Sequence, residues 1–503
     1  MSESLLVKTA RGAGWAIGWR WATRVLGFVN TLILARLLVP GDFGLVAIAT
    51  GFSQSIQAFS SLGIDEAVIR QQSASRATYD TAFTINLIRG LATALVVALC
   101  SWPVANFFGD PRLAPVLWAL AGCSLVTAFE NIGTIEFRRD FAFVQEFKLL
   151  LLPRIASILV TIGTALTWQS HWALITGIAT NQILGIGLGY VMHSFRPRLG
   201  LSAWHDLASF SFWSWSISIA LMVRDRVDGF VIGRFLGLAR VGTYSVGAEL
   251  ATLPTYELAA PLARACFPGF AAAARSGTEA AATYLRILTS VSLVMLPAAA
   301  GVSLVAAPAT VVALGRGWDG VTGVVQILGF PGALVVLGFV SSTFLSAHGL
   351  LRQGFVISLL SMVIRTIAAI ALVSLFGLTG AAAAHALTLT FENCSYMFIT
   401  FRRFDISALA FLRLIWRGLL ATAAMAAVLL VTHLGDDIGN PLRALTVGVV
   451  TGAAVYGSTL FGIWFACGRP IGGETDLIAL VVRMIPAPVL AWCAARLGFP
   501  GPG

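Results

Sequence analysis

The stretch LARLLVPGDFGLVA, residues 34–47, lies between two long apolar runs. The first run ends near Arg36, the chain passes through a Pro-Gly-Asp turn at residues 40–42, and the second run has begun by Gly44. Pro and Gly are the strongest local breakers of regular structure, so this stretch predicts a tight connection between two helices. The stretch IGRFLGLARVGTYS, residues 232–245, repeats the pattern.

The composition indicates an integral membrane protein. Of the 503 residues, 57% are hydrophobic and 11% are charged, and the mean hydropathy is +0.85. Soluble domains carry about 25% charged residues. A fold surrounded by water could not bury so much apolar surface. The net charge is +10. Because the basic residues include only two Lys, Lys8 and Lys148, and no basic run exceeds two residues, nucleic-acid binding is not expected.

An apolar segment of about 20 residues spans a bilayer as a helix, which satisfies its own backbone polar groups. We expect an all-α protein with about 14 transmembrane helices. The predicted spans are 14–38, 44–64, 81–104, 113–136, 143–167, 171–193, 208–233, 241–266, 284–306, 320–346, 353–376, 378–400, 412–433 and 443–466. Residues 474–496 are shorter and mixed, and we interpret them as an interfacial helix or a short span.

The basic residues predict the orientation. Of the 33 Lys and Arg residues, 20 fall in segments that lie inside when the N-terminus is inside, six fall in outer segments, and seven lie within spans. This positive-inside bias predicts cytoplasmic termini. The connecting loops are too short for a soluble domain. The six Cys and six His residues show no ligand spacing, so we expect no metal and no cofactor.

The two turn stretches predict an internal repeat. Gly44 follows Arg36 by eight residues, and Gly242 follows Arg234 by eight residues, with 198 residues between the copies. Six spans per copy give two parallel six-helix bundles around a central cavity, the layout of rocking transporters. We predict one bundle in residues 1–200, a second in 201–405, and two additional helices in 406–503. The four motif residues are predicted to form a gate at the outer ends of the bundles.

The motifs resemble a known family. LARLLVPGDFGLVAIAT, which starts at residue 34, and DGFVIGRFLGLARVGTYSVGAELATLP, which starts at residue 228, are similar to the signatures of the polysaccharide transporter branch of the MOP flippases, the Wzx-like proteins. The resemblance implies a bacterial inner-membrane protein that moves undecaprenyl-diphosphate-linked oligosaccharide from the inner to the outer leaflet. Polysaccharide polymerase and chain-length proteins are then candidate partners.

Ionisable residues inside a membrane are functional candidates by default. Residues at equal distance from a hairpin turn lie at similar depth in its two helices, which predicts partners for three of the seven intramembrane Arg residues. The predicted ion pairs are Arg89–Glu130, Arg226–Glu249 and Arg365–Glu392. The alternative is that these acids titrate and couple transport to protons or sodium.

Arg20 and Arg24 share a helical face and have no acid at matching depth. We predict that Arg24, with Arg20 and Arg224, binds the diphosphate of the lipid carrier, because the guanidinium fork suits phosphate oxygens. Gln57 lies on the polar face of the next helix and joins this predicted site. The alternatives are that Arg20 extends to the membrane surface and that Arg224 pairs with Asp228 four residues later.

Two other functions are alternatives for a membrane protein of this composition. A membrane glycosyl enzyme, such as a ligase or polymerase, needs a large outer loop that carries catalytic groups, and the outer loops here are too short. We therefore expect no enzyme activity. A multidrug exporter of the same superfamily is closer, but its cavity would favour acids for cationic drugs. The excess of intramembrane Arg opposes that interpretation.

Overall fold

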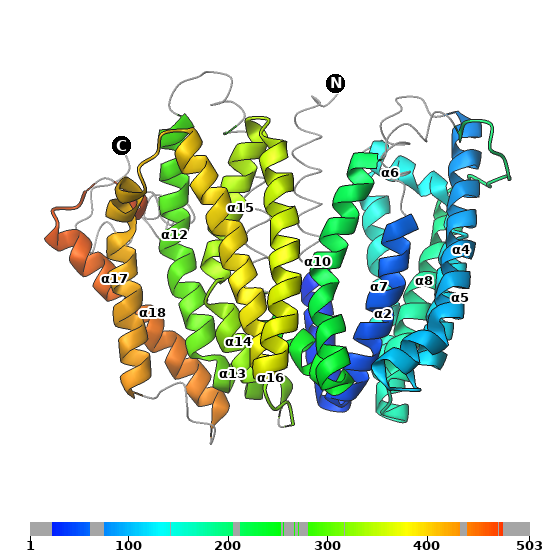
Figure 1. Ribbon diagram of the computed structural model, residues 1–503, viewed down its shortest axis with the longest axis horizontal. Coiled ribbons are helices and arrows are strands. Elements are labelled where there is room, and N and C mark those ends of the chain that lie inside the picture. The colour runs from blue at the N-terminus through cyan, green and yellow to red at the C-terminus, as the bar shows by residue number, and fades with distance from the viewer. Residues whose placement is uncertain are drawn as a thin grey trace, which may run out of the picture. The chain divides into compact units, whose positions relative to one another are not determined.

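The computed structural model describes residues 23–60, 75–140, 142–204, 212–252, 255, 266, 270, 280–315, 317–432, 440–470 and 472–475. Within these residues every regular element is helical (Figure 1). Arg20 and most of the segment 474–496 lie outside the described residues, so the predictions for them are not tested.

The helices fall close to the predicted spans. Two of them cover residues 23–37 and 238–252. The others are α2 (Pro40–Ser60), α4 (Arg76–Phe108), α5 (Leu113–Thr127), η1 (Ile132–Ile135), α6 (Glu136–Arg139), α7 (Phe143–Trp168), α8 (Trp172–Met192), α10 (Phe212–Leu236), α12 (Ala280–Leu304), α13 (Ala306–Leu314), α14 (Val321–Gly329), α15 (Gly332–Ala347), α16 (Leu351–Arg403), α17 (Ala408–Thr432) and α18 (Pro441–Ala466).

Seven helices in the described part of the chain are long and apolar enough to cross a membrane, and the bent pair α14 and α15 makes an eighth. The element α16 is two helices joined at Gly377, whose φ of 61° and ψ of −133° break the helix. This break separates the predicted spans 353–376 and 378–400. A positive φ costs little in Gly, which has no Cβ.

Two predicted spans are not single helices. The span 320–346 bends by 43° between α14 and α15, because Pro331 between them has no N–H to continue the ladder. The span 113–136 ends its α-helix at Thr127 and continues as η1 and α6. The Asn131 side chain accepts a hydrogen bond from the N–H of Gly133, a local bond that competes with a continuing α-helix.

The chain forms two compact units. Unit 1 comprises Met1–Glu249, Thr310–Val324 and Ser358–Thr388, and unit 2 comprises Leu250–Ala309, Val325–Ile357 and Leu389–Gly503. Unit 1 contains both copies of the repeated motif and therefore takes residues from both predicted bundles. The boundaries 1–200, 201–405 and 406–503 stay a prediction.

Unit 1 holds α2, α4, α5, α7, α8 and α10 (Figure 1). The pairs α4–α5 and α7–α8 each pack along their length as hairpins. At the connection between α7 and α8, Ala165 and Ala173 are fully buried against Leu34 of helix 23–37 and Phe43 of α2. This packing fixes the ends of helix 23–37 and α2, where the first copy of the repeated motif lies.

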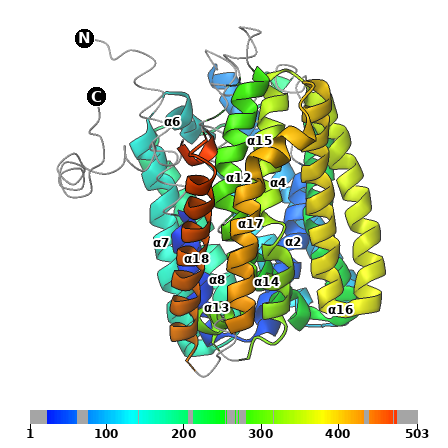
Figure 2. The same cartoon turned by 90° about the vertical axis from the view of Figure 1, so that its left-hand side faces the viewer.

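Unit 2 has an aromatic core in which Phe270, Tyr284 and Phe344 are fully buried. The Tyr284 hydroxyl lies 2.7 Å from the Ser341 hydroxyl, which satisfies both buried polar groups. The helices α12, α17 and α18 run beside one another (Figure 2). Where they meet, the Tyr456 hydroxyl donates to the Leu293 carbonyl.

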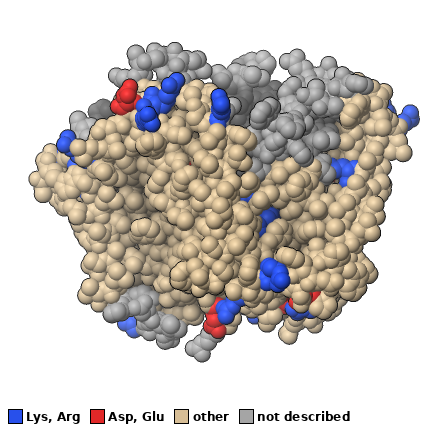
Figure 3. Space-filling view, viewed as in Figure 1, with Lys and Arg blue, Asp and Glu red and all other residues tan. Residues whose placement is uncertain are grey.

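Uncharged residues cover most of the described surface in Figure 3, where Lys, Arg, Asp and Glu form small separate patches, most of them toward the upper and lower edges of the view. Large apolar side chains such as Leu99, Val191 and Val431 are 68–82% exposed. A soluble monomer rarely exposes contiguous apolar surface of this kind, so the described surface is that of a protein surrounded by lipid.

Candidate functional site

The two copies of the repeated motif touch each other. A Cβ added to Gly44 would lie 1.7 Å from the Leu238 carbonyl oxygen, and one added to Gly242 would lie 1.9 Å from the Pro40 carbonyl oxygen. Leu238 is the repeat equivalent of Pro40, so the contact is reciprocal and has the geometry of a local two-fold axis. At this point the two backbones meet with no side chain between them, which only Gly permits. The predicted gate residues Gly44 and Gly242 are therefore in direct contact.

Arg36 and Trp318 make a second reciprocal contact. The Arg36 Nη2 donates to the Val312 carbonyl at 2.5 Å, and the Trp318 Nε1 donates to the Ala35 carbonyl at 2.8 Å. Both carbonyls lie in the last turn of their helices, where no intrahelical donor remains. Each helix end therefore caps the other. Trp318 is also in edge contact with Phe43, at 5.3 Å between ring centroids.

Arg234, the repeat equivalent of Arg36, has a different environment. Its guanidinium lies 5.4 Å from the centre of the Phe107 ring at the end of α4. The adjacent Gly233 lies under Phe108, which would be 2.9 Å from an added Cβ. Phe108 in turn packs on Phe230, at 6.1 Å between ring centroids. The second copy is therefore held by aromatic packing where the first is held by hydrogen bonds.

From the Gly contact inward, α2 and α10 pack along small residues. The Ile48 side chain fills the space beside Gly229 and Gly233. One turn further along α2, the Arg226 side chain crosses Gly51 and donates through Nη2 to the Gln54 side-chain oxygen. The predicted Arg226–Glu249 pair is therefore wrong: equal depth in a hairpin does not bring the pair together, because Arg226 turns toward α2.

Glu249 has other basic neighbours. The charges of Arg24 and Arg154 act on its carboxylate. Arg154 also reaches helix 23–37, where its Nη2 would be 2.9 Å from a Cβ on Gly27. Glu249 thus lies within electrostatic reach of two Arg side chains, and the binding of a diphosphate by Arg24 stays a prediction. Arg24 itself is exposed.

A buried ionic cluster joins α10 to both arms of α16. Arg365 Nε and Nη2 donate to the two Asp228 carboxylate oxygens at 3.1 and 2.5 Å. The Tyr244 hydroxyl donates to Asp228 at 2.6 Å and lies 2.8 Å from His385 Nδ1. The predicted Arg365–Glu392 pair is therefore wrong, because Arg365 finds an acid in another hairpin.

The same cluster changes the partner of Arg224. Asp228 is taken by Arg365, and Arg224 Nε instead lies 3.1 Å from Asp225 Oδ1. The alternative pair Arg224–Asp228 is thus not formed. Both Asp228 and Arg365 are more than nine-tenths buried. A buried pair of this kind is costly to break, because removing one partner leaves the other uncompensated.

The remaining predicted residues lie in α2, α4 and at the end of α5. Arg89 and Glu130 are both described, and no ion pair joins them, although Gly90 packs against Ala128 between the same two helices. Gln57 is exposed, and its Nε2 lies 3.4 Å from the Ser124 hydroxyl. The hairpin depth was thus a correct guide to neighbouring helices but not to ion-pair partners.

A cavity of about 260 Å³ opens between α5, α7 and α8. Polar groups line it, among them Glu130, Glu146, Asn181 and Gln182. The residues that line it include no Lys or Arg. The predicted diphosphate site consists of Arg side chains, so this cavity, which no Arg lines, is not that site. Within the described residues, no group of His, Cys, Asp and Glu side chains is placed to hold a metal ion.

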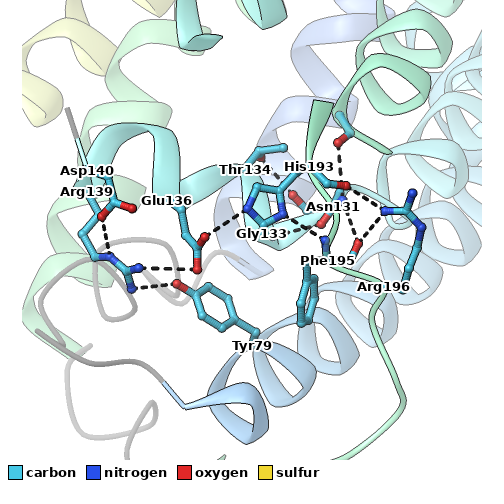
Figure 4. A network of polar contacts seen from close by, with 11 residues as sticks. Tyr79, Asn131, Gly133, Thr134, Glu136, Arg139, Asp140, His193, Phe195 and Arg196 are labelled. Atoms are coloured by element: carbon cyan, nitrogen blue, oxygen red, sulfur yellow. Dashed lines mark hydrogen bonds and ion pairs between the residues drawn. The ribbon is translucent and has the colours of Figure 1, made fainter. Parts of the chain in front are cut away.

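A polar network that the sequence did not indicate ties α4, α6 and the end of α8 together (Figure 4). His193 Nε2 lies 3.0 Å from Glu136 Oε2, and Arg139 Nη2 lies 3.4 Å from Glu136 Oε1. Arg139 Nη1 donates to the Tyr79 hydroxyl at 2.8 Å. Tyr79 and His193 are each more than 50 positions from the α6 pair Glu136 and Arg139, so no local spacing could have revealed how the three helices are joined.

The described geometry is that of a membrane transporter. Many apolar helices carry buried and half-buried Arg residues, and two copies of one motif close on each other at their helix ends. Charges inside a membrane domain and paired structural repeats are the features of membrane transporters.

Comparison with known proteins gives the family. Residues 33–323 match the family described as polysaccharide biosynthesis protein. That range is more than half of the chain, so the chain belongs to this family.

Relatives and solved structures agree with this assignment. The chain is 26% identical over 469 residues to the succinoglycan biosynthesis transport protein ExoT of Rhizobium meliloti, which covers 91% of this chain and 93% of that protein. It is 24% identical over 339 residues to the lipopolysaccharide biosynthesis protein WzxC of Escherichia coli, covering 67% and 69%. The structure of the lipid II flippase MurJ superposes with a TM-score of 0.73 at 12% identity, covering 90% of this chain and 99% of that one. This likeness establishes the fold.

Proposed function

We propose that the protein is a flippase that moves undecaprenyl-diphosphate-linked oligosaccharide from the inner to the outer leaflet of the bacterial inner membrane, for exopolysaccharide or O-antigen synthesis. Two relatives, a succinoglycan biosynthesis transport protein and a lipopolysaccharide biosynthesis protein, support a polysaccharide precursor as cargo. The protein acts without catalysis, has about 14 spans and cytoplasmic termini, and delivers its product to polymerase and chain-length proteins.

The observation that carries the transport mechanism is the reciprocal contact of Gly44 with Gly242. It joins equivalent ends of two repeats, so it closes one side of the space between them. Under the predicted topology this is the outer side, and Arg36 and Arg234 flank it. Opening requires the backbones to part and the capped carbonyls of Ala35 and Val312 to lose their donors. Rocking of the repeats about this contact would alternate access to the two leaflets.

A multidrug exporter is the second candidate, since a transporter of the MATE family superposes with a TM-score of 0.59 at 14% identity. The charges of unit 1 oppose it. Arg226 has a neutral partner in Gln54, whereas a cationic drug needs uncompensated acid.

The test is genetic complementation in a host that lacks its own repeat-unit transporter. Expression of this chain should restore surface polysaccharide and reduce the lipid-linked repeat units that accumulate in the inner leaflet. A chain that is inserted and abundant but restores neither, or that confers only drug resistance, would show the proposal to be wrong.

A further inference from the structure

Of the two Arg residues in the interior of α10, Arg224 and Arg226, one has a neutral hydrogen-bond partner. Arg224 is beside Asp225, and Asp228 is bound by Arg365. Arg226 lies between these two pairs, and its described hydrogen-bond partner is Gln54. A guanidinium inside a membrane domain is costly without a counter-charge. Its retention without an acid therefore indicates that an anion is bound there for part of the working cycle.

The position of Arg226 suits such a ligand. It lies about ten residues from the end of α10, which corresponds to ~15 Å of helix, so it is deep in the span. Gln54 lies on the facing helix α2. Its side chain is exposed, although the helix is predominantly apolar. Gly51 of α2 provides the space that the Arg226 side chain crosses. The Arg226 guanidinium and the Gln54 side-chain amide therefore lie together, one from each copy of the repeat.

We propose that Arg226 binds the diphosphate of the isoprenoid carrier and that Gln54 occupies the guanidinium when no carrier is bound. The proposal rests on the flippase function above and assigns its anion site, which the sequence placed on Arg24. The planar fork of Arg226 offers several N–H donors to phosphate oxygens. The Gln54 oxygen accepts one of them in the empty site. When the diphosphate replaces this oxygen, the Gln54 NH₂ group is free to donate to the same phosphate.

The exchange of partners also couples binding to movement. The Arg226–Gln54 bond joins α10 of one repeat to α2 of the other, on the inward side of the Gly44–Gly242 contact. A diphosphate that takes the guanidinium removes one bond that holds these helices together. Loading therefore weakens the closed contact between the repeats, because a ligand shifts an equilibrium by its differential affinity for the two states.

The experiment uses the purified full-length chain and farnesyl diphosphate, a short isoprenoid diphosphate, as the probe. Binding is measured as the probe concentration that half-saturates the shift in thermal unfolding. Two control ligands are measured in parallel. Farnesol lacks the diphosphate, and phosphatidylglycerol presents an ordinary lipid phosphate. We expect farnesyl diphosphate to stabilise the wild type, and the other two to have at most a small effect.

Three variants separate binding from folding. Arg226→Ala should weaken probe binding at least tenfold, and Arg226→Lys should weaken it less, since charge remains but the fork is lost. Gln54→Ala should strengthen binding several-fold, because the competing acceptor is gone. A purely structural bond predicts the opposite for Gln54→Ala, namely lower stability and no gain in affinity. Arg443→Ala, at an exposed helix start in unit 2, is the matched control and should bind as the wild type does.

The outcomes distinguish this site from the wider function. Equal binding by wild type and Arg226→Ala overturns the assignment to Arg226 and leaves the flippase proposal standing. Equal stabilisation by phosphatidylglycerol and farnesyl diphosphate also overturns it, because a lipid phosphate then suffices. If the wild type neither binds the probe nor restores export, the proposed flippase function is wrong.

Discussion

The two copies of the repeated motif make the same backbone contact with different flanking chemistry. Around the first copy, Arg36 and Trp318 donate hydrogen bonds to helix-end carbonyls. Around the second, Arg234 lies over the Phe107 ring, and Phe108 covers Gly233. A hydrogen bond from a charged group contributes about 1.5–3 kcal/mol, whereas an exposed cation–π contact contributes about 0.5–1 kcal/mol. The shared Gly residues determine where the copies meet, and the flanking residues determine how tightly each side is held.

The largest effect of mutation is expected at the two Gly residues that the copies share. Gly44→Val and Gly242→Val should each abolish polysaccharide export, because an added Cβ would fall less than 2 Å from a backbone oxygen of the opposite copy. The obstructing atom is backbone, so no side-chain rotation relieves it. Export is measured in the complementation strain, with membrane abundance determined in parallel.

The matched control for this pair is Gly41→Val, three residues from Gly44. A Cβ at Gly41 would meet nothing within 4 Å. This variant should export close to the wild-type amount, apart from the small helix-propensity cost of Val. Wild-type export by Gly44→Val would show that the close contact is not needed in transport.

Substitution of Arg36 and of Arg234 tests whether the residues around the first copy hold the contact more tightly than those around the second. Arg36→Gln should open the closed side more than Arg234→Gln, by about 1 kcal/mol or roughly fivefold in the open fraction, since a charged hydrogen bond exceeds an exposed cation–π contact. The reporter is Ser53→Cys in a background without native Cys, since Ser53 is only 4% exposed here. Labelling by an impermeant maleimide from outside gives the open fraction. Equal labelling of the two variants would contradict the ranking.

The sequence predicted the helices and the repeat better than the contacts of the charged residues. Apolar length and the Pro and Gly positions locate the spans, including the break at Gly377, because bilayer thickness and missing N–H groups act locally. The 198-residue offset predicted two equivalent copies with Gly44 and Gly242 at matched outer ends, and the direct contact of these two residues is a finding of the structure.

The ion pairs failed because partner choice is a property of three-dimensional packing. Equal depth in a hairpin selects one neighbouring helix, yet each helix in a bundle has several neighbours. Arg365 therefore reached Asp228 in α10 rather than Glu392. Arg417 and Glu474 form a buried bidentate pair, at 2.6 and 3.1 Å, that no spacing rule indicated. Trp318 was likewise not singled out, because its acceptor Ala35 is distant in sequence.

The smallest effect is expected in the loop beside the aromatic flank, where Asp110 follows Phe107 and Phe108. Arg112 Nη2 lies 2.7 Å from Asp110 Oδ2, and this hydrogen-bonded guanidinium holds the pKa of the Asp110 carboxyl below its ordinary value. A depressed folded pKa means that the ion pair stabilises the fold above the unfolded pKa of about 3.9 and loses that contribution as pH falls through the folded pKa. The Arg112 side chain is 53% exposed, so the stabilisation is at most about 1 kcal/mol. Asp110→Asn should therefore lower the thermal midpoint slightly at pH 7, and the difference from wild type should close near pH 3. Arg112→Gln should give the same small loss, and the double variant should lose no more than either single one. If the difference in thermal midpoint between Asp110→Asn and the wild type persists or grows in acid, Asp110 acts through the geometry of the turn and not through its charge.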